Sequence, residues 1–161
     1  MLTLNVEATK LLKQLKNIVG DSVVTFPKLV NRSAEIIVKD MKDGASKGVD
    51  ITGQKFKSLN PITVKKKKLK GFSRLSLPLT ATGQMTGSFK AGGTGAYVKK
   101  RASAKKNFAE VSAPNVKAPY GIFHNEGIDP LPKREWFGVP TISEQKSIKL
   151  FELEIDRLLR G

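Results

Sequence analysis

Apolar residues open the chain at three- and four-residue steps, with lysines between them. The series consists of Leu4, Ala8, Leu11, Leu12, Leu15, Ile18 and Val19. This period predicts an amphipathic helix, and we expect Gly20 to end it as the residue after the C-cap. A second helix should begin near Phe26-Pro27, because proline is favoured at the first helical position. Its predicted inner face is Val30, Ala34, Ile37 and Met41, and Asp43-Gly44 should stop it.

Residues 44–78 show no hydrophobic period. Gly, Ser, Asn, Pro and Lys dominate, and isolated apolar residues such as Phe56 and Phe72 are scattered among them. We predict a long basic loop, and loops of this length are usually functional or disordered. Its aromatic residues would either pin the loop to the core or stack on nucleic-acid bases.

The next part of the chain has the pattern of short strands. Residues 79–89 suggest a helical turn leading into a strand, and Gly92–Gly95 suggests a hairpin tip without the spacing of a phosphate loop. Strands are expected over 96–101 and 107–113. Thr141 and Glu144 fit a capping box for a last helix that runs to Leu159.

These elements predict an α+β fold: a small antiparallel sheet covered by N-terminal helices and a C-terminal helix, with a long basic loop. A chain of 161 residues suits one domain. The expected parts are helices over 1–43, the basic loop over 44–78, the sheet over 79–118, a short helix and proline-rich arm over 119–140, and the C-terminal helix over 141–161.

Charge is spread unevenly along the chain. The net charge is +15, yet the segment from Ile51 to Ala109 holds fourteen basic residues and no Asp or Glu. A field of one sign implies an anionic partner, either nucleic acid or an acidic protein surface. The residues expected to contact DNA or an acidic partner are Lys65, Lys66, Lys67, Lys68, Lys70, Arg74, Lys99, Lys100 and Arg101. The alternative for Lys65–Lys68 is a solvated loop.

Other features narrow the class of protein. The chain has no cysteine, and no apolar run approaches the ~20 residues of a membrane span. Residues 1–5 lack the basic head and apolar run of a secretion signal, so we expect a soluble protein made in the cytoplasm. The single histidine, His124, has only Glu126 and Asp129 near it, and packing is its favoured role. We therefore expect no catalytic residue, no metal and no cofactor.

The segment from Tyr120 to Pro140 is the most distinctive one. It contains the only tryptophan and the only histidine, and it runs through Pro130, Pro132 and Pro140. Proline fixes φ and removes a hydrogen-bond donor, so a short helical turn followed by a stiff extended arm is predicted. Aromatic pairs such as Trp136-Phe137 are usual anchors in cores and interfaces.

Three blocks of the chain resemble the virion-morphogenesis (tail-completion) family of tailed bacteriophages. The first is Asp50-x-x-Gly53-x-x-Phe56-x-x-Leu59, followed by Thr63 and the lysine run. The second is Leu79-x-x-Thr82-Gly83-Gln84-Met85-x-x-Ser88-Phe89, where Met85 replaces a leucine. The third joins Tyr120-x-x-x-His124-x-x-Gly127 to Pro132-x-Arg134-x-Trp136-Phe137-Gly138. Glu135 stands where family members often carry proline.

The resemblance implies a structural neck protein, without enzymatic activity, that joins the tail to the head connector. It implies a homo-oligomeric ring, commonly six-fold, with tail-terminator or tail-tube proteins and connector or portal-adaptor proteins as partners. Genomic DNA in the channel is a further candidate partner, and no membrane is involved. The implied location is the virion neck, reached from the host cytoplasm during assembly. The expected interface residues are Arg134, Trp136, Phe137, Tyr120 and His124.

Two alternatives stay open. The basic middle segment suits a sequence-independent nucleic-acid binder, whose affinity falls steeply with salt. An enzyme such as a nuclease is the weaker alternative, and His124 is the one residue on which it would depend.

Overall fold

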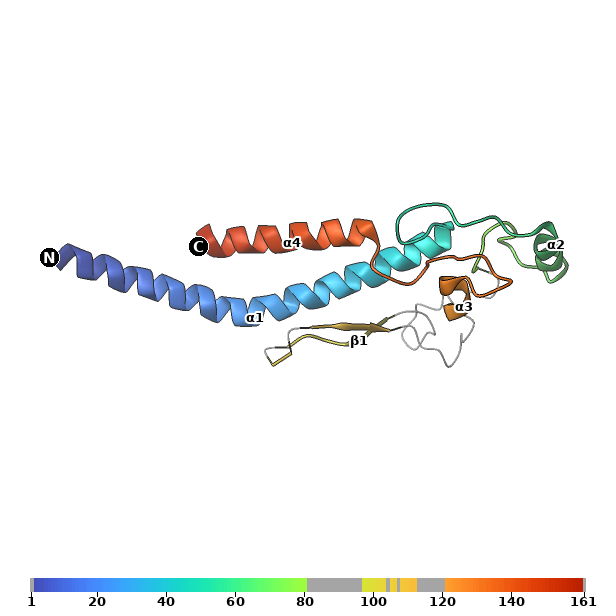
Figure 1. The fold of residues 1–161 in the computed structure, drawn as a ribbon. Helices are drawn as coiled ribbons and strands as arrows, with labels where there is room; N and C mark the ends of the chain where they lie inside the picture. The colour runs from blue at the N-terminus through green and yellow to red at the C-terminus, as the bar shows by residue number, and fades with distance from the viewer. Residues whose placement is uncertain (1, 81–96, 104, 107, 113–120, 161) are drawn as a thin grey trace.

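The longest described element is α1 (Leu2–Lys47), a helix of 46 residues. The remaining elements are α2 (Pro61–Leu69), β1 (Tyr97–Lys100), β2 (Glu110–Ser112), α3 (Gly121–Glu126) and α4 (Thr141–Arg160). This computed structural model describes residues 2–80, 97–103, 105–106, 108–112 and 121–160, with the backbone alone for 2–19, 21–22, 97–100 and 112. In Figure 1, α4 runs back beside α1, and α2 and α3 lie at the end away from both termini.

The predicted break between two N-terminal helices is wrong. Gly20 and Pro27 both lie inside α1, which Figure 1 shows as one continuous, bent helix. An internal glycine costs about 1 kcal/mol and an internal proline about 3 kcal/mol, and proline commonly bends a helix. Packing opposes these costs, since Phe26 stacks on Phe151 of α4 with ring centroids 6.3 Å apart.

The end of α1 is also later than Asp43-Gly44. Gly48 adopts a φ of 77°, which favours glycine. Its amide donates to the Ala45 carbonyl at 3.2 Å, and the Val49 amide donates to the Gly44 carbonyl at 3.0 Å. This pair of bonds is the Schellman motif, which satisfies carbonyls at a helix end.

The core follows the inner face of α1. Its buried apolar residues recur at helical spacing: Leu29, Ala34, Val38, Met41 and Ala45. Of the predicted inner face, Ala34 and Met41 are buried, whereas Val30 and Ile37 are half-buried. The helix contacts α4 and also both strands, so α1 is the shared layer of the fold.

The strands β1 and β2 form an antiparallel ribbon. Tyr97 pairs with Ser112 and Val98 with Val111 before an irregularity in the register. The Asn31 side chain on α1 holds the end of β1, donating to the Ala102 carbonyl at 3.0 Å and accepting from the Ala102 amide at 2.7 Å.

Helices therefore dominate this fold, and the predicted sheet beneath two helical coverings is not confirmed. In the described part of the chain, α4 packs on α1 and not on the strands. The strand expected to end at Phe89 and the glycine turn over Gly92–Gly95 lie outside the described residues. No described helix is long and apolar enough to span a membrane.

The lysine run is helical, which corrects the prediction of a loop over 44–78. Asn60 caps α2 by accepting from the Ile62 amide at 2.9 Å, and Pro61 occupies the first turn. Lys67 is buried, and its ammonium donates to the carbonyls of Arg74 and Leu77. The remaining lysines of the run, Lys65, Lys66 and Lys68, are exposed.

A polar contact ties the first turn of α4 to α1. Thr141 is the first helical residue, so Pro140, whose carbonyl accepts from the Ser143 and Glu144 amides, takes the capping position predicted for Thr141. Ser143 is fully buried, and its hydroxyl donates to the Asp40 carboxylate at 2.9 Å. Lys146 pairs with the same carboxylate at 2.8 Å.

Replacing Ser143 by alanine should lower the free energy of unfolding by about 1 kcal/mol, because a hydrogen bond to a buried partner is lost. Ser147→Ala is the matched control on the same helix, since the buried Ser147 hydroxyl has no hydrogen-bond partner. This control should be neutral or stabilising. Urea unfolding of both variants measures the difference, and equal effects would contradict the assigned contact.

Candidate functional site

The predicted arm exists and starts at a position that only glycine fits. We use "the arm" for residues 127–140, which follow α3 without helix or strand. Gly127 has a φ of 70°, and a Cβ there would lie 2.7 Å from the Lys133 backbone. The amides of Gly127 and Ile128 donate to the Phe123 carbonyl at 3.0 Å and so end α3. A larger residue at this position would clash with the backbone, so the tight reversal of the chain requires glycine.

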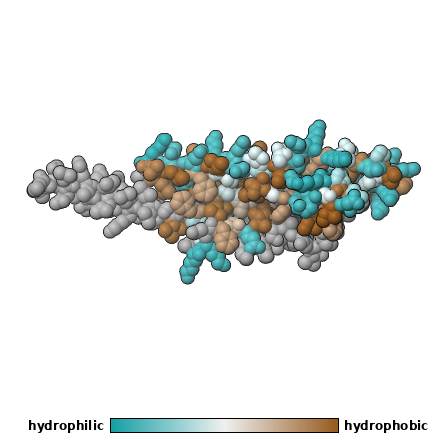
Figure 2. Space-filling model, in the orientation of Figure 1, coloured by the Kyte–Doolittle hydropathy of each residue, from teal (hydrophilic) through white to brown (hydrophobic). Residues whose placement is uncertain are grey.

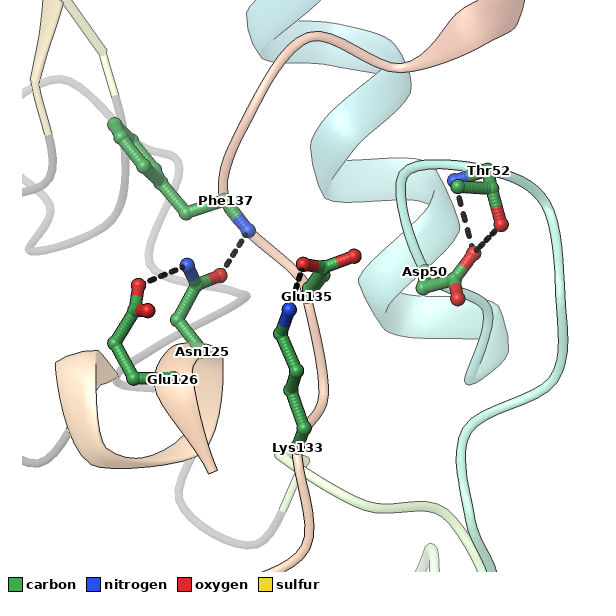
Figure 3. Close-up of polar contacts among 7 residues, drawn as sticks. All are labelled: Asp50, Thr52, Asn125, Glu126, Lys133, Glu135 and Phe137. Carbon is green, nitrogen blue, oxygen red and sulfur yellow. Dashed lines mark hydrogen bonds and ion pairs between the residues drawn. The ribbon is translucent and has the colours of Figure 1, made fainter. Parts of the chain in front are cut away.

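The arm is fastened to the loop that follows α1 and to α3. The Ile51 amide donates to the Glu135 carbonyl at 3.0 Å, and the Thr141 amide donates to the Ile51 carbonyl at 2.9 Å. Asn125 on α3 accepts from the Phe137 amide at 3.0 Å (Figure 3). Asp50 shapes the loop by accepting from the Thr52 amide at 2.8 Å, also visible in Figure 3.

Trp136 belongs to the core of this chain. It is 6% exposed and packs with Ala45 and Phe56, with Phe137 at the edge of its ring, 5.6 Å between centroids. Its indole nitrogen donates to the Gly121 carbonyl at 3.1 Å. The expectation that Trp136 presents its ring to a partner is therefore corrected: the ring holds the arm down, and half-buried Phe137 keeps some free surface.

Arg134 is also turned inward and is 4% exposed, so its side chain does not lie on the outer surface of the molecule. Its amide donates to the His124 carbonyl at 2.7 Å, and its Nη2 donates to the Lys57 carbonyl at 3.2 Å. The Nε atom is buried without a hydrogen-bond partner. Burial lowers the pKa of the guanidinium, because a charge is costly where water is excluded.

His124 lies beside this guanidinium and is half-buried. Burial, and then the charge of Arg134, lower the pKa of its imidazole, so the ring is neutral near pH 7. The Arg134 Nη1 lies 3.5 Å from Nδ1 of His124. Because an arginine nitrogen can only donate, Nδ1 is the acceptor and Nε2 carries the ring proton.

These residues border a cleft with a volume of about 580 Å³. We call it the Arg134 cleft. Its walls come from the segment before α2, the first turn of α2, the end of α3 and the arm. The lining residues are Lys57, Ser58, Leu59, Asn60, Thr63, His124, Gly127, Asp129, Pro130, Leu131, Pro132 and Arg134. The cleft thus unites His124, Asp129 and Arg134 with residues more than sixty positions earlier in the sequence.

The predicted basic residues do not form one surface. Lys65, Lys66, Lys68, Lys70 and Arg74 are exposed on or after α2, whereas Lys67 is buried. Arg101 directly follows β1, which lies away from α2 in Figure 1, and it pairs with Glu35 at 2.7 Å. The structure describes only the backbone of Lys99 and Lys100, and Tyr120 lies outside the described residues.

Sequence reasoning missed several residues that build this site. Asn125 fixes the arm, Asn60 caps α2, and Lys57 supplies a carbonyl to Arg134. The Asn60-Pro61 pair was a usable signal, because asparagine is a strong N-cap and proline favours the next position. No local pattern marks Asn125 or Lys57, since their partners are distant in the sequence. In the described part of the chain, no three metal-binding side chains gather.

Comparisons of this chain with family models, with curated proteins and with solved structures find no match. The likeness to the tail-completion family therefore depends on the three sequence blocks alone.

We expect the stability of the protein to fall as the pH drops below about 6.5, the ordinary pKa of histidine in an unfolded chain. The pKa of His124 is lowered on folding, so the unfolded chain binds the proton more readily. Its stabilising contribution is complete above that pH and is lost as the pH falls toward the lowered value. Urea unfolding at several pH values should show this loss, and His124→Gln should reduce it.

The single histidine makes an independent check simple. Its imidazole signals in an NMR titration should report a pKa below 6.5. A titration at or above that value would refute the buried, neutral imidazole.

Proposed function

We propose that this protein is a structural assembly component of a phage neck, a tail-completion protein whose copies form a ring between tail and head connector. The sequence blocks supply the family hypothesis. The observation that best supports assembly is a stripe of apolar side chains on α4 that the chain itself leaves exposed. We define this α4 stripe as Ile148, Ile155 and Leu159, which are 54%, 43% and 70% exposed.

The α4 stripe has the geometry of a helix contact. Its members are spaced seven and four residues apart, which places them on one side of a helix. The neighbouring face of α4 is already used, since Leu158 is buried and Phe151 stacks on Phe26. Figure 2 shows hydrophobic residues gathered over the α1–α4 pair. Exposed apolar surface of this kind marks interaction sites.

The occupant we propose is a second copy of the chain, through the first part of its α1. In Figure 1, α1 continues well past the C-terminal end of α4. Residues 2–15 of α1, which we call the overhang, have apolar residues at helical spacing, among them Leu4, Leu11 and Leu15. A contact between the overhang of one copy and the α4 stripe of the next joins two different surfaces, which is the heterologous interface that a ring requires.

Arg134 and Trp136 support this proposal by shaping the subunit, because both are buried. Half-buried Phe137 and exposed Lys65, Lys66 and Lys68 remain candidate contacts to tail or connector proteins. Channel DNA is a candidate for the same lysines.

Ile148→Glu should weaken self-association by about tenfold or more, because a charge would be buried in an apolar contact. Gln145→Glu is the matched control, since Gln145 is exposed on the same helix and is not a member of the α4 stripe. Sedimentation velocity over a concentration series measures both variants. The proposal fails if the unmodified protein stays monomeric at high concentration and also does not bind tail-tube or connector proteins.

The second candidate function is sequence-independent nucleic-acid binding by α2. The observation that favours it is the row of exposed lysines on this helix, Lys65, Lys66 and Lys68. Changing these three residues to glutamine should lower affinity for duplex DNA and reduce the log–log salt slope by roughly 0.9 per lost phosphate contact. Lys105→Gln, an exposed change beside the ribbon, is the control. No binding of the unmodified protein at ~50 mM salt would exclude this function.

A further inference from the structure

The Arg134 guanidinium is a buried charge without a carboxylate partner among the described residues. Its side chain is 4% exposed, and its assigned contacts are a backbone carbonyl and a neutral imidazole. Among the described residues, its Nε has no hydrogen-bond partner. Burying an unpaired charge is costly, so buried arginines normally meet an anion.

The surroundings of Arg134 favour an anion from outside the chain. Arg134 is one of the residues that line an open cleft of about 580 Å³, so its surroundings are not a closed core. Lys57 lies on the same cleft, and so does the N-terminal turn of α2 with Asn60 and Thr63. A helix N-terminus carries partial positive charge. Asp129 is the one acidic residue of the lining, it is exposed, and it forms no ion pair with Arg134 in this structure.

The other lining residues indicate which groups would flank the anion in the bound partner. Leu59, Pro130, Leu131 and Pro132 add apolar surface on the two sides of the cleft. Ligand-binding clefts commonly combine apolar lining with a few polar or charged groups that fix the orientation of the bound group. Duplex phosphates fit less well, because they are usually met by exposed basic side chains, whereas Arg134 lies deep.

We propose that the Arg134 cleft binds an acidic peptide segment of a partner protein, with a carboxylate on the Arg134 guanidinium and apolar flanking residues against Leu59 and Leu131. Charge-assisted and bidentate bonds make guanidinium–carboxylate pairs strong. The helices α2 and α3, which contribute walls of the cleft, lie at the opposite end of the molecule from the C-terminus of α4 (Figure 1), so this site goes beyond the ring contact proposed above.

The test uses the full chain and two short peptides, acetyl-Leu-Glu-Leu-amide and the matched acetyl-Leu-Gln-Leu-amide. NMR of the arginine Nε–H groups provides the readout, because the Arg134 Nε–H is unpaired before binding. The Arg134 signal should shift and saturate with the acidic peptide. Affinity for the glutamine peptide should be at least about tenfold weaker.

Exposed variants avoid disturbing the buried arginine. Lys57→Gln should weaken binding of the acidic peptide severalfold, and Asp129→Asn should strengthen it by removing a competing negative charge. Lys105→Gln makes the same charge change as Lys57→Gln, away from the cleft, and should leave affinity unchanged.

Three outcomes would overturn the proposal. One is an Arg134 signal that does not shift with the acidic peptide, or that shifts equally with both peptides. Another is a short DNA duplex or inorganic phosphate that displaces the acidic peptide at lower concentration than free peptide does, which would assign the cleft to phosphate. The third is a loss of both folding stability and peptide binding in Asp129→Asn, which would make Asp129 the resident partner of Arg134.

Discussion

Trp136 connects segments that are far apart in the sequence. Its ring packs on Ala45 near the end of α1 and on Phe56 in the following loop, and its indole nitrogen bonds to α3. These contacts help to determine where the arm runs and therefore where α4 begins. Large aromatic side chains dominate the energetics of small cores, and Trp136 together with the Ile51 backbone bonds fastens the otherwise irregular arm.

The two ends of the molecule present different kinds of surface. At one end, the arm, α3 and α2 surround the Arg134 cleft, and α2 also carries a row of exposed lysines. Toward the other, α1 and α4 leave apolar helix surface uncovered. The self-contact that we propose for α4 and the partner contact that we propose for the Arg134 cleft use different elements. Lys67 shows that basic residues of this segment also serve the fold, since its ammonium satisfies two loop carbonyls.

Sequence patterns predicted the elements whose signals are local. The short helix before the arm, the arm itself, β1 and the last helix all lie where their residues indicated. The wrong predictions also followed local signals, which the folded structure overrides. Glycine and proline at positions 20 and 27 suggested a break, but α1 continues through both. The lysine run suggested a loop, although Asn60-Pro61 before it is a strong helix start.

By itself, the sequence determined the helical periods, the turn at Gly127, the absence of helix and strand in the arm and the uneven charge, because each depends on neighbouring residues or on composition. Only the tertiary structure decided that Trp136 and Arg134 face inward, that Lys67 is buried, and that His124 and Arg134 share a cleft with Lys57 and α2. The physical reason is that burial depends on which distant segments meet. A tryptophan or an arginine on a proline-stiffened arm reads the same in the sequence whether its side chain points to a partner or to its own core.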